Sequence, residues 1–189
     1  MSEPLDRIII DADLCIKLGN SEKYPFLREV LPLLAKDICI HACAYDEVKM
    51  PHCAVEQLLW LVENGKVKVV NETGLCPADR AVYEMSYCRL AAVMISHDKP
   101  NKNRGEACSL AYAKATGITI FATDERNLQP IISSRLNIGI NDIHCLRIID
   151  IIGMAYNGDI DIQRKTAKAL WIIAGKKKED FDKSVWPLE

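Results

Sequence analysis

The hydrophobic pattern of the chain alternates between strand-like and helix-like periods. Three consecutive isoleucines at 8–10 predict a strand buried on both faces, spanning about Arg7–Asp11. Apolar residues at helical spacing predict a helix over about Tyr24–Ala35, and DICIHACAY predicts a second strand over Asp37–Tyr45. A strand, a helix and another strand in this order are typical of α/β proteins with a parallel sheet.

The alternation continues through the middle of the chain. Proline and glycine residues mark the expected ends of several elements. In order, these are a helix from Pro51 to Asn64-Gly65, a strand over Lys66–Val70, a helix from Pro77 to about Ser96, a helix EACSLAYAKAT that stops at Gly117, a strand over Ile118–Thr123 and a last short strand over Ile138–Ile140.

The final part of the sequence has a helical pattern. Asn141-Asp142 is expected to cap a helix in IHCLRIIDIIGMAY, and a second helix is expected over about Ile162–Ala174. The whole pattern predicts a three-layer α/β/α fold with a central, mainly parallel sheet of four to five strands. We expect residues 1–142 to form this domain and residues 143–189 to form a C-terminal helical extension packed on it.

Composition limits the functional classes without selecting one. The chain has 189 residues, enough for one domain, and a net charge of −2 argues against nucleic-acid binding through bulk positive potential. Its eight cysteines form no paired framework, which favours buried free thiols and a cytoplasmic location. No secretory signal and no apolar stretch long enough to cross a membrane is expected.

Acidic residues follow several of the predicted strands. Asp11, Glu47 and Asp124 each come after a strand, and the carboxyl ends of parallel strands meet in one crevice. Glu106 begins a small-residue helix and is expected to point inward. Without matching lysines or arginines these four carboxylates would repel one another, and a divalent cation such as Mg²⁺ or Mn²⁺ would relieve the repulsion.

Each of these acids also has a simpler explanation. Asp13 is either a turn cap or a secondary metal ligand, and Glu106 alone fits a first-turn acid favoured by the helix dipole. Asp124 can open a turn. The order of the set along the chain is therefore more informative than any single member.

Three segments carrying these acids resemble the PIN-domain family. They are IIIDADLCIKLG, YDEV and RGEACSLAYAKATGITIFATDERN, and the resemblance extends over about Ile8–Ile140. It implies a Mg²⁺- or Mn²⁺-dependent endoribonuclease acting on RNA. It also implies a toxin-type nuclease as one form, with an antitoxin protein as partner or a homodimer.

The resemblance assigns roles to individual residues. Asp11, Glu47, Glu106 and Asp124 match the acidic quartet, with Asp11, Glu106, Asp124 and Glu125 as metal ligands. Glu47 is expected in a loop before Pro51, a departure from the family pattern. Substrate contacts are expected from Asp13, Lys102, Arg104 and Thr123, and Lys176–Lys178 is either a further RNA contact or a flexible cationic end.

Two other functions remain open, together with one other metal site. The strand followed by DADLC also resembles the haloacid-dehalogenase phosphatases, in which Asp11 would be phosphorylated. A non-catalytic PIN-like scaffold that binds protein or RNA is the other alternative. Cys39, His41 and Cys43 would share one face of the predicted second strand, but a straight strand spreads them too far for zinc, so core packing is favoured.

Overall fold

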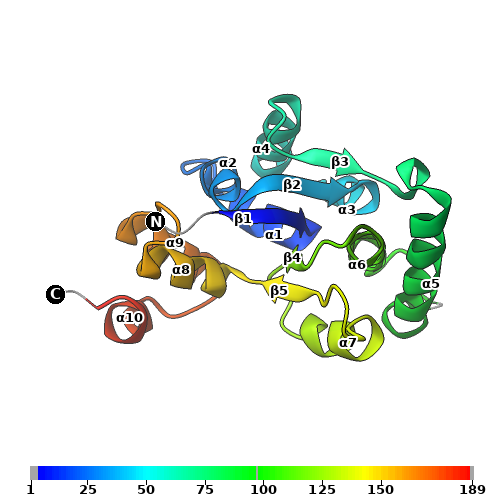
Figure 1. Ribbon diagram of the computed structural model, residues 1–189. Helices are drawn as coiled ribbons and strands as arrows, with labels where there is room; N and C mark the ends of the chain where they lie inside the picture. The colour runs from blue at the N-terminus through cyan, green and yellow to red at the C-terminus, as the bar shows by residue number, and fades with distance from the viewer. Residues whose placement is uncertain (1–3, 97, 188–189) are drawn as a thin grey trace.

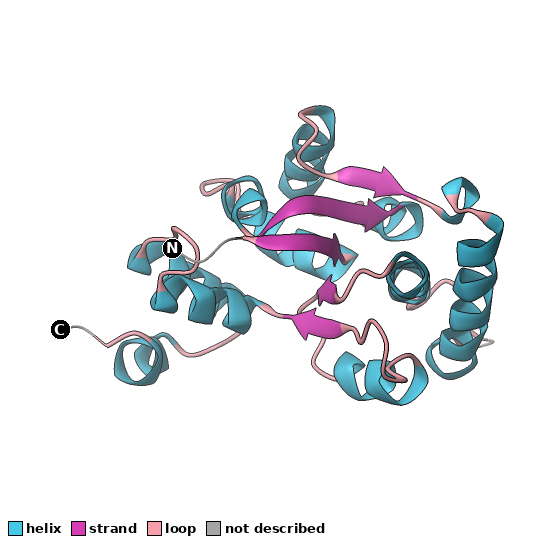
Figure 2. Ribbon diagram, in the orientation of Figure 1, coloured by secondary structure: helices cyan, strands magenta, loops and turns pink. Residues whose placement is uncertain are grey.

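The computed structural model describes residues 4–96 and 98–187 of the chain. In this described part, five parallel strands form one sheet with the order β3-β2-β1-β4-β5. The strands are β1 Leu5–Ile10, β2 Ala35–His41, β3 Lys68–Val70, β4 Ile120–Ala122 and β5 His144–Leu146. Helices enclose the sheet (Figure 2), so the predicted α/β fold is confirmed.

The isoleucine run explains why β1 is the central strand. Ile8 and Ile10 are fully buried in one hydrophobic core, and Ile9 is fully buried in a second core on the other face of the sheet. Side chains alternate along a strand, so three apolar residues in a row require both faces to be covered. The sequence thereby places β1 between two helical layers.

Different helices supply the two layers. The core containing Ile8 is covered by α1, α2, α4, α8 and α9, whereas the core containing Ile9 is covered by α5, α6 and α7. In Figure 1, α8, α9 and α10 lie at the end of the molecule opposite α5. The bounds are α1 Ala12–Gly19, α2 Phe26–Val30, α4 His52–Glu63, α5 Pro77–Met94, α6 Arg104–Thr116, α7 Leu128–Arg135, α8 Ile148–Asn157, α9 Arg164–Ile173 and α10 Lys178–Asp180.

The first predicted helix and the second predicted strand are both shorter than expected. α2 ends at Val30 and passes through a 3₁₀ turn, η1 Leu31–Leu33, which includes Pro32, a residue without a backbone N–H. β2 ends at His41, and a further helix, α3 Ala42–Glu47, follows at once. The prediction of strand as far as Tyr45 was therefore wrong, because short apolar runs fit either period.

The region after α7 also differs from the prediction. Ile138 and Ile140 are 74% and 76% exposed and form no strand, whereas β5 lies at His144–Leu146. Asp142 caps no helix, because β5 follows it and α8 begins only at Ile148, with Arg147 as its N-cap. Oδ1 of Asp142 instead accepts a hydrogen bond from the amide of Gly139 at 3.2 Å. The segment 143–189 supplies an edge strand of the sheet as well as the C-terminal helices.

The remaining short elements complete the two layers. A 3₁₀ turn, η2 Glu72–Gly74, joins β3 to α5, and a π-helical segment, η3 Phe181–Val185, follows α10. All eight cysteines are free thiols, and Cys88 on α5 is exposed, in contrast to the expected burial. Among the described residues, no helix is both long and apolar enough to cross a bilayer.

Candidate carboxylate centre

Asp11 lies where β1 ends and α1 begins. Its extended backbone makes it the N-cap of α1, and its Oδ1 accepts a hydrogen bond from the amide of Ala12 at 2.8 Å. Its Oδ2 accepts a hydrogen bond from Oγ1 of Thr123 at 3.1 Å. The residue is 1% exposed. The chain therefore fixes both oxygens of a fully buried carboxylate at the carboxyl edge of the sheet.

The environment of Asp11 opposes its ionisation. Burial, followed by the nearby charge of Glu106, raises the pKa of Asp11 to about 8. The hydrogen bonds from Thr123 and Ala12 lower that pKa and offset only part of the effect. At neutral pH the Asp11 carboxyl accordingly keeps its proton unless a cation takes the proton's place.

Thr123 is a positioning residue for Asp11. It follows β4, is 0% exposed, and its hydroxyl accepts a hydrogen bond from the amide of Glu125 at 3.2 Å while donating to Asp11. Its hydroxyl therefore connects the ends of β1 and β4. The substrate contact expected at Thr123 stays a prediction.

Glu106 lies in the first turn of α6 and is half-buried. Burial raises its pKa, and the charges of Glu47, Asp13 and Glu125 raise it further, against the lowering effect of its own backbone amide. Its Oε2 is buried and has no hydrogen-bond partner. A buried carboxylate oxygen without a partner is energetically costly, which makes Glu106 more than an exposed helix-dipole acid.

Glu47 was expected in a loop before Pro51. It is instead the last residue of α3. Its Oε1 accepts a hydrogen bond from the amide of Gly105 at 2.8 Å, at the start of the helix that carries Glu106. Burial raises the pKa of Glu47, while the Gly105 amide and the Arg104 guanidinium lower it. This contact joins α3 to α6 beside Glu106.

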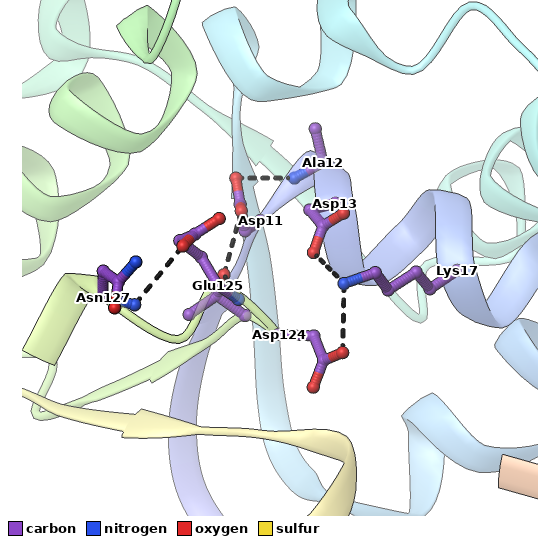
Figure 3. A network of polar contacts seen from close by, with 8 residues as sticks. Asp11, Ala12, Asp13, Lys17, Asp124, Glu125 and Asn127 are labelled. Carbon is purple, nitrogen blue, oxygen red and sulfur yellow. Dashed lines mark hydrogen bonds and ion pairs between the residues drawn. The ribbon is translucent and has the colours of Figure 1, made fainter. Parts of the chain in front are cut away.

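Asp124 has a cationic partner that the sequence analysis did not foresee. Nζ of Lys17 lies 3.0 Å from Oδ2 of Asp124 and 2.8 Å from Oδ2 of Asp13 (Figure 3). Burial lowers the pKa of Lys17, but its bonds to Asp13 and Asp124 raise it above the ordinary value. The expectation of an acidic set without a matching lysine was therefore wrong.

The four predicted acids share one edge of the sheet without forming a closed cluster. The charge of Glu106 raises the pKa of Asp11, and the charge of Glu47 raises the pKa of Glu106, whereas Asp124 is held by Lys17. Among the described residues, no three of these carboxylates have oxygens that all lie within 4.8 Å of one another. An ion held here would keep some of its own water, as Mg²⁺ usually does.

The predicted loop contacts fall into two separate cavities. Lys102, Glu106 and Glu125 line a cavity of about 280 Å³, so Lys102 lies beside the acidic centre as expected. Glu125 also accepts a hydrogen bond from the amide of Asn127 at 3.3 Å. Arg104 instead lines a second cavity, of about 310 Å³, together with Glu47.

A third cavity is lined by basic side chains that the sequence pattern did not indicate. Arg126, Arg147 and Lys176 line about 110 Å³ of space with Asp124. Nη2 of Arg147 donates to the carbonyl oxygen of Arg126 at 2.9 Å, which fixes the guanidinium at this wall. In the part of the chain that the structure describes, no carboxylate forms an ion pair with these three side chains. Arg147 directly follows β5, so a correct assignment of that strand would have indicated it.

No protein-family model matches the chain, and no curated protein matches it in sequence.

Proposed function

We propose that this protein is a Mg²⁺- or Mn²⁺-dependent endoribonuclease of the PIN-domain type. The proposal is supported above all by the pair Asp11 and Glu106. Asp11 is a fully buried carboxyl with a pKa near 8, and Glu106 beside it has a buried oxygen without a partner. An acid whose charge is disfavoured by burial and by a neighbouring carboxylate, as that of Asp11 is, gains most from a bound dication.

The donor atoms at this centre suit a hard cation. All of them are carboxylate oxygens, the ligands that Mg²⁺ and Mn²⁺ prefer. Asp11 and Glu106 would hold the ion, with Glu125 on the wall of the same cavity as Glu106 and Asp124 held by Lys17. When bound, the ion would polarise the scissile phosphodiester and lower the pKa of a coordinated water.

The cations around the centre fit a phosphodiester backbone. Lys102 lies in the cavity of Glu106, and Arg126, Arg147 and Lys176 lie in the cavity of Asp124. A nucleic-acid strand crossing the acidic centre would meet a cation before and after the scissile bond. Arginine binds phosphate through a planar fork, and such contacts supply affinity without reading sequence. The choice of RNA over DNA rests on the PIN-domain resemblance.

The resemblance extends the proposal to partners and location. A toxin-type nuclease would pair with an antitoxin protein or form a homodimer. The free thiols fit a cytoplasmic protein.

A phosphatase mechanism is less well supported by the geometry of Asp11. A phosphorylated aspartate must offer one oxygen for in-line attack on phosphorus, with room for the transferred group. Both oxygens of Asp11 already accept hydrogen bonds, and the residue is 1% exposed. Ligation of a cation requires only one further lone pair on either oxygen.

Cleavage of labelled single-stranded RNA by the full chain tests the proposal. We expect cleavage with Mg²⁺ or Mn²⁺ and none with a chelator. Asp11→Asn and Asp124→Asn should abolish cleavage while the fold, followed by circular dichroism, is retained. The exposed Glu63 on α4 gives a matched control, since Glu63→Gln removes a carboxylate far from the centre in the sequence and outside its contacts.

The same assay separates the alternatives. Hydrolysis of a small aryl phosphate that is lost in Asp11→Asn alone would support the phosphatase instead. RNA binding without cleavage at any concentration of Mg²⁺ or Mn²⁺ would indicate a scaffold. Cleavage that survives in both Asp11→Asn and Asp124→Asn would overturn the proposed mechanism.

A further inference from the structure

A second group of metal-ligating side chains lies outside the carboxylate centre. His41 ends β2, Cys43 lies in the first turn of α3, and Cys108 lies on α6. One ring nitrogen of His41 and the two sulfur atoms all lie within 4.8 Å of one another. The strand-based trio of Cys39, His41 and Cys43 does not form, because Cys43 belongs to a helix and Cys39 packs in the core.

His41 has the protonation and support that a ligating histidine requires. Nδ1 accepts a hydrogen bond from the amide of Cys43 at 3.1 Å, so the proton of the neutral ring is on Nε2, 3.4 Å from Oε2 of Glu72. Burial lowers the pKa of His41, which favours this neutral form. Nε2 is buried and makes no hydrogen bond to a described residue, and the Glu72 carboxylate that faces it is the kind of group that supports a metal-bound histidine.

The ring of His41 is also fixed in orientation. It stacks on Tyr83 with centroids 6.1 Å apart and meets Tyr112 edge-on at 6.0 Å. The residue is 0% exposed. A ring held by two aromatic neighbours and a carboxylate can present Nδ1 in one direction only, toward the start of α3.

The two thiols face each other beside a cation. Burial raises the pKa of Cys108 to about 12, while Tyr83 and the Arg104 guanidinium act to lower it. Cys43 is half-buried and lines the 310 Å³ cavity that also contains Glu47 and Arg104. The site is therefore open to solvent on the Cys43 side, and the Arg104 guanidinium opposes part of the rise in the pKa of Cys108.

We propose that His41, Cys43 and Cys108 form a binding site for a zinc-class transition-metal ion, separate from the carboxylate centre. One imidazole and two thiolates are the soft donor set that selects Zn²⁺ over Mg²⁺. Each thiol loses its proton to the buffer as its sulfur binds the ion, and Nδ1 exchanges the Cys43 amide for the ion. A water from the open cavity completes the tetrahedron.

Such an ion would join the elements that carry the acidic residues. Cys43 lies one turn before Glu47 on α3, and Cys108 lies two residues after Glu106 on α6. The ion would hold α3 and α6 to the end of β2. The site stands on its own geometry and does not require the proposed nuclease activity.

Cobalt titration of the reduced, metal-free full chain tests the site. We expect one Co²⁺ per chain to produce a thiolate-to-cobalt charge-transfer band that Zn²⁺ abolishes and a large excess of Mg²⁺ does not. Cys43→Ser and Cys108→Ser should each remove about half of the band, because its intensity follows the number of bound thiolates. Cys88→Ser, which changes an exposed cysteine on α5, should leave the band unchanged.

A substitution at Glu72, which faces Nε2 of His41, tests the site without changing either cysteine. Glu72→Gln should weaken zinc affinity about 10–100-fold, the usual effect of losing a carboxylate that supports a metal-bound histidine. Absence of a charge-transfer band in the parent chain, or a band of undiminished intensity in both Cys43→Ser and Cys108→Ser, would overturn the proposal. So would a Cys43–Cys108 disulfide in the purified chain that forms without any bound metal.

Discussion

The amide of Gly105 donates a hydrogen bond to Oε1 of Glu47 at 2.8 Å, and a Cβ built on Gly105 would lie 2.7 Å from Oε2 of the same side chain. The position of the Glu47 carboxylate thus depends on a residue without a side chain. The atoms in the way are the far end of a flexible glutamate. An added methyl group would therefore turn Glu47 away without moving the backbone.

Gly105→Ala should accordingly separate the role of Glu47 from folding. We expect RNA cleavage to fall at least as far as in Glu47→Gln. The free energy of unfolding should change little, because alanine gains up to about 1 kcal/mol of helix propensity, which offsets the lost contact. Gly153→Ala on α8, where a Cβ meets open space, is the matched control. Full activity in Gly105→Ala would remove Glu47 from the mechanism.

The raised pKa of Asp11 predicts a pH-dependent stability in metal-free buffer. The folded chain keeps this proton up to about pH 8, and the unfolded chain only up to its ordinary value near 3.8. Between these values the folded state binds more protons, so the free energy of unfolding falls as pH rises, by about 1.4 kcal/mol per unit. Asp11→Asn should remove this slope and stabilise the protein at neutral pH.

Urea unfolding with a chelator, at several pH values between about 5 and about 8, measures this effect. Asp37→Asn, at an acid already paired with Arg7 and Lys68, should retain the slope of the parent chain. Equal slopes in the parent and in Asp11→Asn would show that Asp11 ionises without penalty.

Metal affinity should rise with pH for the same reason. The ion must displace the proton of Asp11, so the affinity for Mn²⁺ should rise by up to about tenfold per pH unit until about pH 8. Thr123→Val removes a hydrogen bond that lowers the pKa of Asp11, so it should move this curve to higher pH. Calorimetric titration of both chains measures the shift, and superimposable curves would contradict the positioning role of Thr123.

Lys17 should limit the affinity of the centre for cations while holding Asp124 in place. Lys17→Met removes a positive charge from Asp13 and Asp124, so we expect tighter Mn²⁺ binding with slower RNA cleavage. In metal-free buffer the loss of this partly buried pair should cost on the order of 1 kcal/mol of unfolding free energy. Lys23→Met, at a lysine over the ring of Tyr24, should change none of the three measurements. Weaker Mn²⁺ binding in Lys17→Met would contradict the claim that Lys17 limits the affinity of the centre for cations.

The sequence predicted the parts of this structure that depend on local pattern. The isoleucine run placed β1 and Asp11, Gly117 ended α6 as expected, and the small-residue helix carried Glu106 into a half-buried position. Burial on both faces of a strand leaves a clear signature in a single sequence. Residues directly after such strands could therefore be proposed as a site.

The parts that were missed depend on short elements and on distant partners. α1 has only eight residues and follows β1 directly, so its start at Ala12 was not recognised, and neither was the Asp13–Lys17 pair one turn apart. The bond from Lys17 to Asp124 spans 107 positions and has no local signature. His41 and Cys108 likewise meet only through the packing of α6 against β2 and α3.

The cationic cavity beside Asp124 should control how strongly the protein binds RNA. Arg147 and Lys176 have no carboxylate partner among the described residues, so each can neutralise one backbone phosphate. Replacing either with Ala in the Asp11→Asn chain should weaken RNA binding for all sequences alike. It should also reduce the slope of log K against log salt by about 0.7 for a single strand, because one fewer counterion is released.

Fluorescence anisotropy at several salt concentrations measures both quantities. Lys66→Ala provides the control, since this exposed lysine precedes β3 and lies at the amino edge of the sheet, away from the centre. The double variant Arg147→Ala, Lys176→Ala should lose about twice the single effect if the two cations hold separate phosphates. An unchanged salt slope in the double variant would mean that the RNA leaves the acidic centre by another path. Lys102, in the cavity of Glu106, would then be the remaining cation that could contact a phosphate.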